Sequence, residues 1–336
     1  MFDSIYFSSS WEFLGNHPDW KLTFTQDQPT RGPVITEGRI RAVHQDLNIR
    51  AYGSNETKTL TKFSVSSLPA LLHGQNGMPL SGQEEVDAAL EVLDRLLGQI
   101  ARPLDKTRTF IKVDTSLNLF NLPYRHIDVA LQRSKLPGSR QAVVHYVGES
   151  LTYRRGFTEL QFYDKRLQMV AKGRVPKGQE QHLDPCTRVE LRLETKDLDK
   201  ELGDGQPVTD LQIPPAYECL RRHILSLGLT RIDGVHNLDT YLARVGVESP
   251  ELLDLYLKSC LKPDYARRKL NEISAMMPLM ADNPIDWDVI LPVDHPPLEM
   301  QNYVPGALFG EHRDLVEEVR TRRGMGTGPH RAFEGT

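Results

Sequence analysis

Cysteine is scarce in this chain of 336 residues, and the patterns in which cysteine usually functions are missing. The three cysteines, Cys186, Cys219 and Cys260, lie far apart and form no CxxC pair. This spacing provides neither a disulfide framework nor a structural zinc site, and it favours a reducing cytoplasm. No run approaches the roughly 18 apolar residues of a membrane span. The first residues also lack the basic and apolar regions of a signal peptide, so we expect no membrane partner.

The signatures of nucleotide cofactors are missing too. The sequence contains no GxxxxGK[ST] phosphate loop, no GxGxxG dinucleotide fingerprint, no GxSxG nucleophile elbow and no HExxH metal motif. We therefore expect neither an ATP site nor a nicotinamide or flavin cofactor.

Positive charge is limited overall but unevenly distributed. The net charge is −4, because 41 basic residues stand against 45 acidic ones, and this excludes nucleic-acid binding through bulk charge alone. The net charge is −4 for residues 1–100, +7 for residues 101–200 and −7 for residues 201–336. We expect an anionic partner to be held by the middle third, although a solvated basic face would give the same sum.

Hydrophobic periodicity predicts an α+β fold with an antiparallel sheet and helices packed on it. Strands are predicted at residues 60–65, 110–115, 142–147, 160–163 and 189–194. Ser81 and Glu84 form a capping box before an apolar helical stripe that runs to Ile100, and a second helix is predicted at residues 124–134. Residues 201–213 read as a linker.

The last third of the chain is predicted to be helical and then irregular. From residue 215 to about residue 277 the pattern is helical. One predicted stripe consists of Tyr217, Leu220, Ile224 and Leu227, and the other of Leu252, Leu255, Tyr256 and Leu261. Prolines are frequent from residue 278, and residues 322–328 read as a flexible tail. The predicted division is an α+β domain at 1–205, a helical domain at 206–277 and a proline-rich extension with a tail at 278–336.

Three predicted strands carry polar side chains on one face. In residues 110–117, Ile111, Val113 and Thr115 share one face, and Lys112 and Asp114 share the other. In residues 158–163, Leu160 and Phe162 share the apolar face, whereas the opposite face carries Glu159, Gln161 and Tyr163. In residues 188–194, the polar face carries Arg188, Glu190, Arg192 and Glu194. If these faces lie on one side of one sheet, they form a surface for metal and phosphate that includes a phenol; a solvated sheet face would look identical.

His73 and Gln75 form a further potential metal pair. They are two residues apart, so an extended chain would point both side chains to one side. The pair offers one nitrogen and one oxygen ligand, in place of the two nitrogens of a His-x-His site. A histidine beside a glycine turn with no metal role is the alternative.

Four stretches, taken together, resemble one protein family. Residues 67–76 (SLPALLHGQN) resemble the segment ending in H-G-H-N or Q-G-H-N in filamentous-phage gene II replication proteins and their plasmid relatives. Residues 111–114 (IKVD) resemble that family's R-I-D strand. Residues 148–168 resemble its E-S-x-x-[YW] … Y-x-K-x-x-E block, and residues 188–193 (RVELRL) resemble its closing R-[VF]-E-x-R strand. The resemblance covers residues 60–195 and contributes little beyond them.

The resemblance implies a rolling-circle replication initiator of the HUH-endonuclease type, encoded by a phage or plasmid and acting in the cytoplasm of a bacterial host. Such enzymes nick one strand at a replication origin, stay joined to the 5′ phosphate through a tyrosine, leave a 3′ hydroxyl primer and later rejoin the strand. Their partners are origin DNA, as duplex and single strand, and host helicase and replication proteins. In this reading residues 1–205 are the nicking and joining domain.

The resemblance also implies roles for particular residues. Tyr163 matches the linking tyrosine and Lys165 the family lysine, while His73, Gln75 and Asp114 match the ligands of a divalent metal. One nitrogen among several oxygen ligands suits Mg²⁺ or Mn²⁺. Two departures stand out: Gln75 replaces the usual second histidine, and Gln168 replaces the usual glutamate after the lysine.

The chemistry of phosphodiester cleavage is compatible with these roles. A tyrosine with an unperturbed pKa of about 10 is mostly protonated at neutral pH, so a nearby cation such as Lys165 or the metal must favour the phenolate. A divalent ion would polarise the scissile phosphate. A tyrosyl phosphodiester conserves the energy of the broken bond, so rejoining needs no ATP, in keeping with the missing phosphate loop.

The remaining candidate residues would contact DNA or the metal. Glu190 is a metal ligand, an arginine partner or plain surface, and these alternatives stay open. Tyr153 stacks on a base or packs, because the family tolerates Trp at this position. The residues predicted to contact DNA are Tyr153, Arg154, Arg155, Arg188 and Arg192. The competing functions are a non-catalytic origin-binding or copy-control protein and a metal-dependent phosphodiesterase that uses Asp114 and Glu190 without a covalent intermediate.

Overall fold

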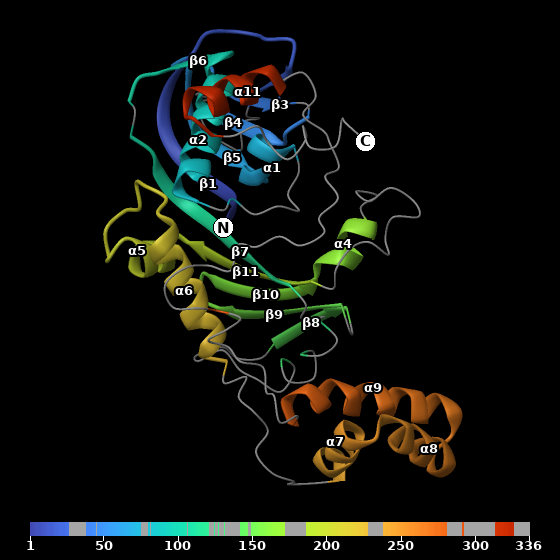
Figure 1. Ribbon diagram of the computed structural model, residues 1–336. Coiled ribbons are helices and arrows are strands. Elements are labelled where there is room, and N and C mark those ends of the chain that lie inside the picture. Colours follow the sequence, from blue (N-terminus) through green and yellow to red (C-terminus); the bar gives the residue numbers. More distant parts are fainter. Residues whose placement is uncertain are drawn as a thin grey trace, which may run out of the picture. The chain divides into compact units, whose positions relative to one another are not determined.

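The structure, a computed structural model, divides into two compact units built from interleaved segments (Figure 1). Unit 1 comprises Met1–Ser116, Arg192–Ala216 and Tyr303–Thr336, and unit 2 comprises Leu117–Leu191 and Tyr217–Asn302. The structure describes residues 1–26, 38–44, 46–74, 80, 82–105, 107–120, 124, 127, 131, 142–146, 149–171, 186–227, 238–280, 291 and 313–325.

Unit 1 contains an antiparallel sheet in which the strands follow the order β2-β3-β4-β5-β1-β7, with β6 paired to β1. These strands are β1 (Phe2–Phe13), β2 (Trp20–Gln26), β3 (Gly38–His44), β4 (Ile49–Ser54), β5 (Thr59–Val65), β6 (Ala101–Pro103) and β7 (Thr109–Phe120). Alternate residues of β3, β4 and β5 are buried and form the core, among them Ile40, Ala42, Ala51 and Phe63. Phe7 stacks on Phe63 with ring centroids 5.1 Å apart.

A β-bulge in β5 changes which side chains reach the polar face of this sheet. Tyr52 of β4 lies opposite Lys62, but the next residue, Gly53, lies opposite Leu60, so Thr61 is the extra residue. Gly53 is required here, because a Cβ at this position would lie 1.9 Å from the Thr59 carbonyl oxygen. The bulge keeps Leu60 in the core while Lys62 stays exposed on the opposite side.

The described residues of unit 1 also form helices. They are α1 (Leu68–His73), α2 (Gln83–Gly98), α5 (Thr195–Leu202) and α11 (Arg313–Arg322). Glu91 of α2 forms ion pairs with Arg322 and Arg323, and Arg95 pairs with Glu318 at 2.7 Å. These contacts join α11, which was not predicted, to a helix more than two hundred residues earlier in the chain.

Unit 2 contains a second run of antiparallel strands in the order β11-β10-β9-β8. The strands are β8 (Ala142–Tyr146), β9 (Ser150–Arg155), β10 (Thr158–Asp164) and β11 (Cys186–Glu194). β7 and β11 are neighbours in the sheet order, and each supplies residues to both units. Helix α4 (Lys165–Ala171) follows β10 directly, and α6 (Ile213–Leu225) begins in unit 1 and ends in unit 2.

Three consecutive helices of unit 2 form a small hydrophobic core. They are α7 (Leu238–Glu248), α8 (Pro250–Cys260) and α9 (Pro263–Met280), and their buried residues include Leu242, Leu253, Leu257 and Ile273. The predicted stripe is wrong for Leu252, Leu255 and Tyr256, which are exposed, whereas its fourth residue, Leu261, packs against this core. The core stripe of α8 lies one residue further round the helix, because Leu253 and Leu257, four residues apart, are the ones that face α7 and α9.

The structure confirms the predicted α+β class with an antiparallel sheet, and it corrects several details. Ile111 is a bulged residue between the pairs Tyr6–Lys112 and Phe7–Phe110, so Phe110, not Ile111, enters the core. Helix α2 has Gly82 as its N-cap and no side-chain cap, so the predicted capping box does not start it. Within the predicted helix at 124–134, the described residues Tyr124, Ile127 and Leu131 are helical and buried.

The two compact units divide the chain differently from the predicted boundaries after residues 205 and 277. Composition along the chain cannot reveal that distant segments pack into one unit. Across the part of the chain that the structure describes, no helix combines the length and the apolar character needed to cross a bilayer.

We expect unit 1 to lose stability in mild acid because of His44. Burial lowers the pKa of His44 below its ordinary 6.5, although Asp19 and Asp46 raise it, and its ring packs edge-on against Trp20 at 5.2 Å. The unfolded chain therefore binds a proton that the folded chain excludes, and stability falls as the pH drops below about 6.5. In urea titrations at about pH 7.5 and about pH 5.5, His44→Phe should lose less free energy of unfolding than wild type. Equal losses in both proteins would exclude His44 as a source of the pH dependence.

Candidate functional site

Tyr163 lies on strand β10, where alternation separates an apolar from a polar face. Leu160 and Phe162 are fully buried on the apolar side, as predicted. Tyr163 belongs to the other face, yet only 5% of it is exposed. The alternation of β11 is also confirmed, because Val189, Leu191 and Leu193 are all buried in the core.

The Tyr163 phenol is hydrogen-bonded to Glu190 of β11, which forms an ion pair with Arg188 of the same strand. Its hydroxyl donates to Oε1 of Glu190 at 2.6 Å, and the same carboxylate oxygen lies 3.0 Å from Nε of Arg188. Arg188 is 0% exposed, so its positive charge has to be balanced inside the protein. Of the three alternatives for Glu190, the structure shows the arginine partner. Arg188 itself presents no surface to a phosphate.

Lys165 approaches Tyr163 from a helix, not from the strand. β10 ends at Asp164 and α4 begins at Lys165, so this lysine is the first residue of the helix. The ammonium group nevertheless lies 5.8 Å from the centroid of the Tyr163 ring, and it donates to Oε1 of Gln168 at 2.9 Å. Gln168, which stands where the family has glutamate, therefore orients the lysine.

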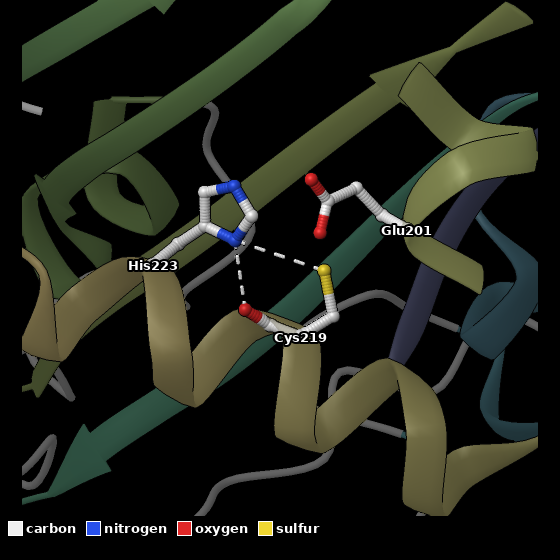
Figure 2. A group of neighbouring side chains, drawn as sticks. All are labelled: Glu201, Cys219 and His223. Carbon is white, nitrogen blue, oxygen red and sulfur yellow. Dashed lines mark hydrogen bonds between the residues drawn. The ribbon is translucent and has the colours of Figure 1, made fainter. Parts of the chain in front are cut away.

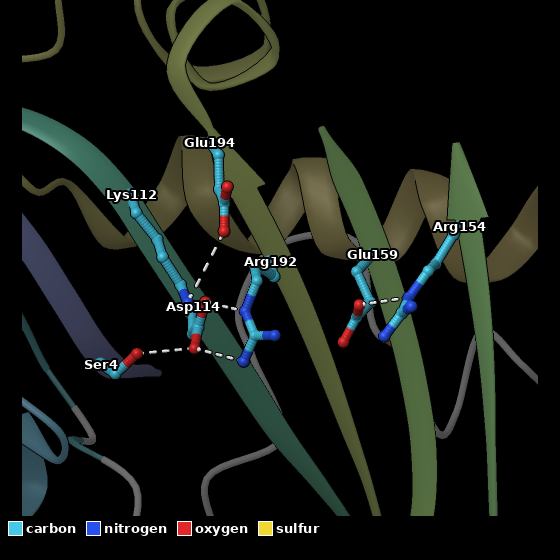
Figure 3. A network of polar contacts seen from close by, with 7 residues as sticks. All are labelled: Ser4, Lys112, Asp114, Arg154, Glu159, Arg192 and Glu194. Carbon is cyan, nitrogen blue, oxygen red and sulfur yellow. Dashed lines mark hydrogen bonds and ion pairs between the residues drawn. The ribbon is translucent and has the colours of Figure 1, made fainter. Parts of the chain in front are cut away.

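Tyr153 packs in the interior, which is the second of its two predicted alternatives. It is fully buried on β9, donates its hydroxyl to the Leu131 carbonyl oxygen and packs edge-on against Phe162 at 6.3 Å. No face of its ring is left for a base in this structure. Its neighbour Arg154 is exposed and pairs with Glu159 at 2.7 Å (Figure 3), and Arg155 is partly exposed.

In unit 1, Asp114 is engaged by two protein groups (Figure 3). Arg192 donates from Nε to Oδ1 at 2.9 Å and from its terminal nitrogen to Oδ2 at 3.1 Å, and the Ser4 hydroxyl donates to Oδ2 at 2.6 Å. Lys112, on the same face, lies 3.6 Å from Glu194. Both carboxylate oxygens of Asp114 are thus taken, and this arrangement does not fit a metal ligand. The metal role of Asp114 remains a prediction.

His73 is placed by a helix end, whereas the prediction assumed an extended chain. It is the last residue of α1, which Ser67 caps, and Gly74 follows in the left-handed conformation with φ of 71°. His73 is buried, and within the described part of the chain neither ring nitrogen has a hydrogen-bond partner. Nε2 lies 3.7 Å from a Glu85 carboxylate oxygen. An imidazole with unbonded nitrogens beside a carboxylate fits a metal ligand; Gln75 lies outside the described residues.

The sequence analysis missed a pair of side chains on α6 in unit 2. His223 donates from Nδ1 to the Cys219 carbonyl oxygen at 2.8 Å, and the same nitrogen lies 3.7 Å from Cys219 Sγ (Figure 2). Both residues are buried. A cysteine and a histidine four residues apart place two potential metal ligands on one side of a helix, and this C-x-x-x-H spacing was the available signal. Glu201, also labelled in Figure 2, belongs to unit 1.

Comparison with known proteins gives a distant likeness to a solved structure. No family model matches the chain, and no curated protein matches it. Among solved structures, the chain is similar to a rolling circle replication initiator protein from Geobacillus stearothermophilus, with 12% sequence identity and a TM-score of 0.32. The alignment covers 85% of this chain and 98% of that one.

The metal prediction can be tested by direct binding. We expect His73→Phe to weaken Mn²⁺ binding, measured by calorimetry, by about tenfold or more. His44→Phe is the matched control, because His44 is a second buried histidine of unit 1 whose ring nitrogens have no hydrogen-bond partner among the described residues. Gln75→His should tighten binding. Unchanged affinity in His73→Phe would show that this histidine is not a ligand.

Proposed function

We propose that this protein initiates rolling-circle DNA replication by nicking one strand at an origin, with Tyr163 as the nucleophile. The observation that carries the proposal is the hydrogen bond of 2.6 Å from the Tyr163 hydroxyl to Glu190. A phenol that already donates to a carboxylate has a proton acceptor in place for attack on phosphorus. Origin DNA would be the partner, and no nucleotide cofactor is required.

The cleavage step balances with these groups alone. The Tyr163 oxygen forms a bond to phosphorus as the bond from phosphorus to the 3′ oxygen breaks, and the phenol proton moves to Glu190. The departing 3′ oxygen takes a proton from solvent and becomes the hydroxyl that primes synthesis. The 5′ phosphate stays on Tyr163, and the reverse sequence rejoins the strand without ATP.

Lys165 and Arg188 support this step from two sides. Arg188 holds the Glu190 carboxylate in place beside the phenol. The Lys165 ammonium, 5.8 Å from the ring centroid, favours negative charge on the phenol oxygen during attack and when that oxygen leaves during rejoining. Because only 5% of Tyr163 is exposed, the proposal requires that DNA binding uncover the phenol.

The same low exposure favours a second candidate function. In this second function, the tyrosine enclosed with Glu190 and Arg188 has a structural role alone and holds β10 against β11. The protein would then bind an origin without cutting it. A phosphodiesterase without a covalent step is the third possibility, and it predicts activity that does not depend on the phenol. One pair of variants distinguishes all three functions.

Tyr163→Phe should bind origin DNA but neither nick it nor form a covalent adduct. Tyr153→Phe is the matched control, because each change removes a buried hydroxyl that donates one hydrogen bond, at a cost of about 1–3 kcal/mol, and only one removes the nucleophile. Supercoiled replicon DNA with Mn²⁺ or Mg²⁺ is the substrate, and mass spectrometry of the nucleotide-bearing peptide is the measurement. We expect the nucleotide on Tyr163.

Each contrary outcome identifies a different function. Nicking by Tyr163→Phe, with no labelled peptide, would support the phosphodiesterase. Binding without nicking by wild type, Tyr153→Phe and Tyr163→Phe alike would support the non-catalytic protein. A labelled Tyr153 would overturn the assignment of the nucleophile.

A further inference from the structure

Four strands of unit 1 carry positive charge and no negative charge. Strands β2, β3, β4 and β5 contain five basic residues and no aspartate or glutamate, within a chain whose net charge is −4. The five are Lys21, Arg39, Arg41, Arg50 and Lys62. Such a segregation of charge is unusual for a solvated sheet face, on which both signs normally mix.

The strand register places four of these five side chains, all except Arg39, on one face in two adjacent rows. In the first row, Arg41 of β3 lies opposite Tyr52 of β4, and Tyr52 lies opposite Lys62 of β5. Directly paired residues of antiparallel strands share a face, about 5 Å apart. Tyr52 is therefore flanked by a cation on each side.

The second row lies two residues further along the strands. Lys21 is opposite Val43, Val43 is opposite Arg50, Arg50 is opposite Ser64, and Ser64 is opposite Tyr6 of β1. A step of two residues keeps the same face and moves about 6.7 Å along a strand. The two rows together form what we call the basic sheet face: Tyr6, Lys21, Arg41, Arg50, Tyr52 and Lys62.

Three of the four cations of this face are exposed, and the fourth, Arg50, is partly exposed. Lys21, Arg41 and Lys62 are exposed, and none of the three forms an ion pair with any residue that the structure describes. The neighbouring positions on these strands, such as Ile40, Ala51 and Phe63, point into the core instead. The face therefore offers charge that the fold does not use for its own stability.

Two tyrosines lie among the cations and are close to each other. Burial, and secondarily the neighbouring Tyr52 phenol, raise the pKa of Tyr6 above its ordinary value of 10.0, so the ring stays neutral. Both tyrosines are partly exposed. Flat aromatic rings between lysines and arginines on an open sheet are the elements with which proteins stack bases and neutralise phosphates of single strands.

We propose that the basic sheet face binds single-stranded DNA, with phosphates on Arg41, Arg50 and Lys62 and a base on Tyr52. A single strand is favoured over a duplex because only unpaired bases present a ring face to a tyrosine. The surface lies wholly within unit 1, whereas Tyr163 lies in unit 2, so this binding goes beyond the proposed nicking and does not depend on it.

The test is fluorescence anisotropy of the full chain with a labelled oligothymidylate of roughly 20 nucleotides, longer than the site on one small fold. Affinity is measured in EDTA across a series of salt concentrations. Arg41→Gln combined with Lys62→Gln should make the log–log salt slope shallower by about 1.4, since each contact to a single strand contributes about 0.7. Lys196→Gln combined with Lys200→Gln is the control, because it removes the same charge from exposed positions of α5 in the same unit.

One further variant completes the test. Tyr52→Leu should weaken binding about fivefold or more without changing the salt slope, and the loss should be confined to the single strand and absent for a duplex of equal length. The measurement follows binding in EDTA and involves no strand cleavage, so a failure of the nicking proposal leaves this result intact. A salt slope for the Arg41 and Lys62 double variant equal to that of the control would overturn the proposal. An equal loss by Tyr52→Leu on duplex DNA would overturn the choice of a single strand.

Discussion

The buried positive charge of Arg188 is the constraint around which the polar side of unit 2 is organised. A guanidinium removed from water must have a carboxylate beside it, and losing one member of such a pair typically costs about 3–5 kcal/mol. Glu190 fills that requirement two residues along the same strand, and its oxygen then accepts the Tyr163 hydroxyl from the next strand. The orientation of the phenol is thus a consequence of charge balance, and it holds β10 and β11 in register at this point.

Hydrophobic periodicity predicted correctly those parts of the fold in which a residue pattern is compatible with only one arrangement of buried and exposed faces. The alternation in residues 160–163 and 189–194 has the correct faces, because a half-buried strand tolerates no other arrangement. The prediction failed where a local irregularity moves the pattern by one residue, as at the bulged Ile111, or where two helical stripes compete. On α8 both faces carry leucine, and only the packing of α7 and α9 decides that Leu253, not Leu252, is buried.

The candidate site was predictable residue by residue but not as an arrangement. The sequence indicated that Tyr163 and Glu190 lie on polar faces, yet the register that brings them within 2.6 Å depends on strand pairing across a long connection. The basic sheet face was hidden for a related reason. Its cations lie within the first hundred residues of the chain, whose net charge is negative because acidic residues elsewhere in that segment, many of them in α2, outnumber the basic ones. Basic residues that are separated along the sequence become neighbours when the strands that carry them pair in the sheet.

The interleaving of the two units has a consequence for the order in which the protein can form during synthesis. Unit 1 combines the first 116 residues with β11's end, α5 and α11, and α11 leaves the ribosome only after all of unit 2. The ion pairs between Glu91 and Arg322 therefore close a loop of more than two hundred residues, and such non-local contacts form late and slowly. Until α11 has been synthesised, the nascent chain carries the sheet of unit 1 with one side of α2 uncovered. Packing of α11 on α2 is therefore among the last steps in the folding of unit 1.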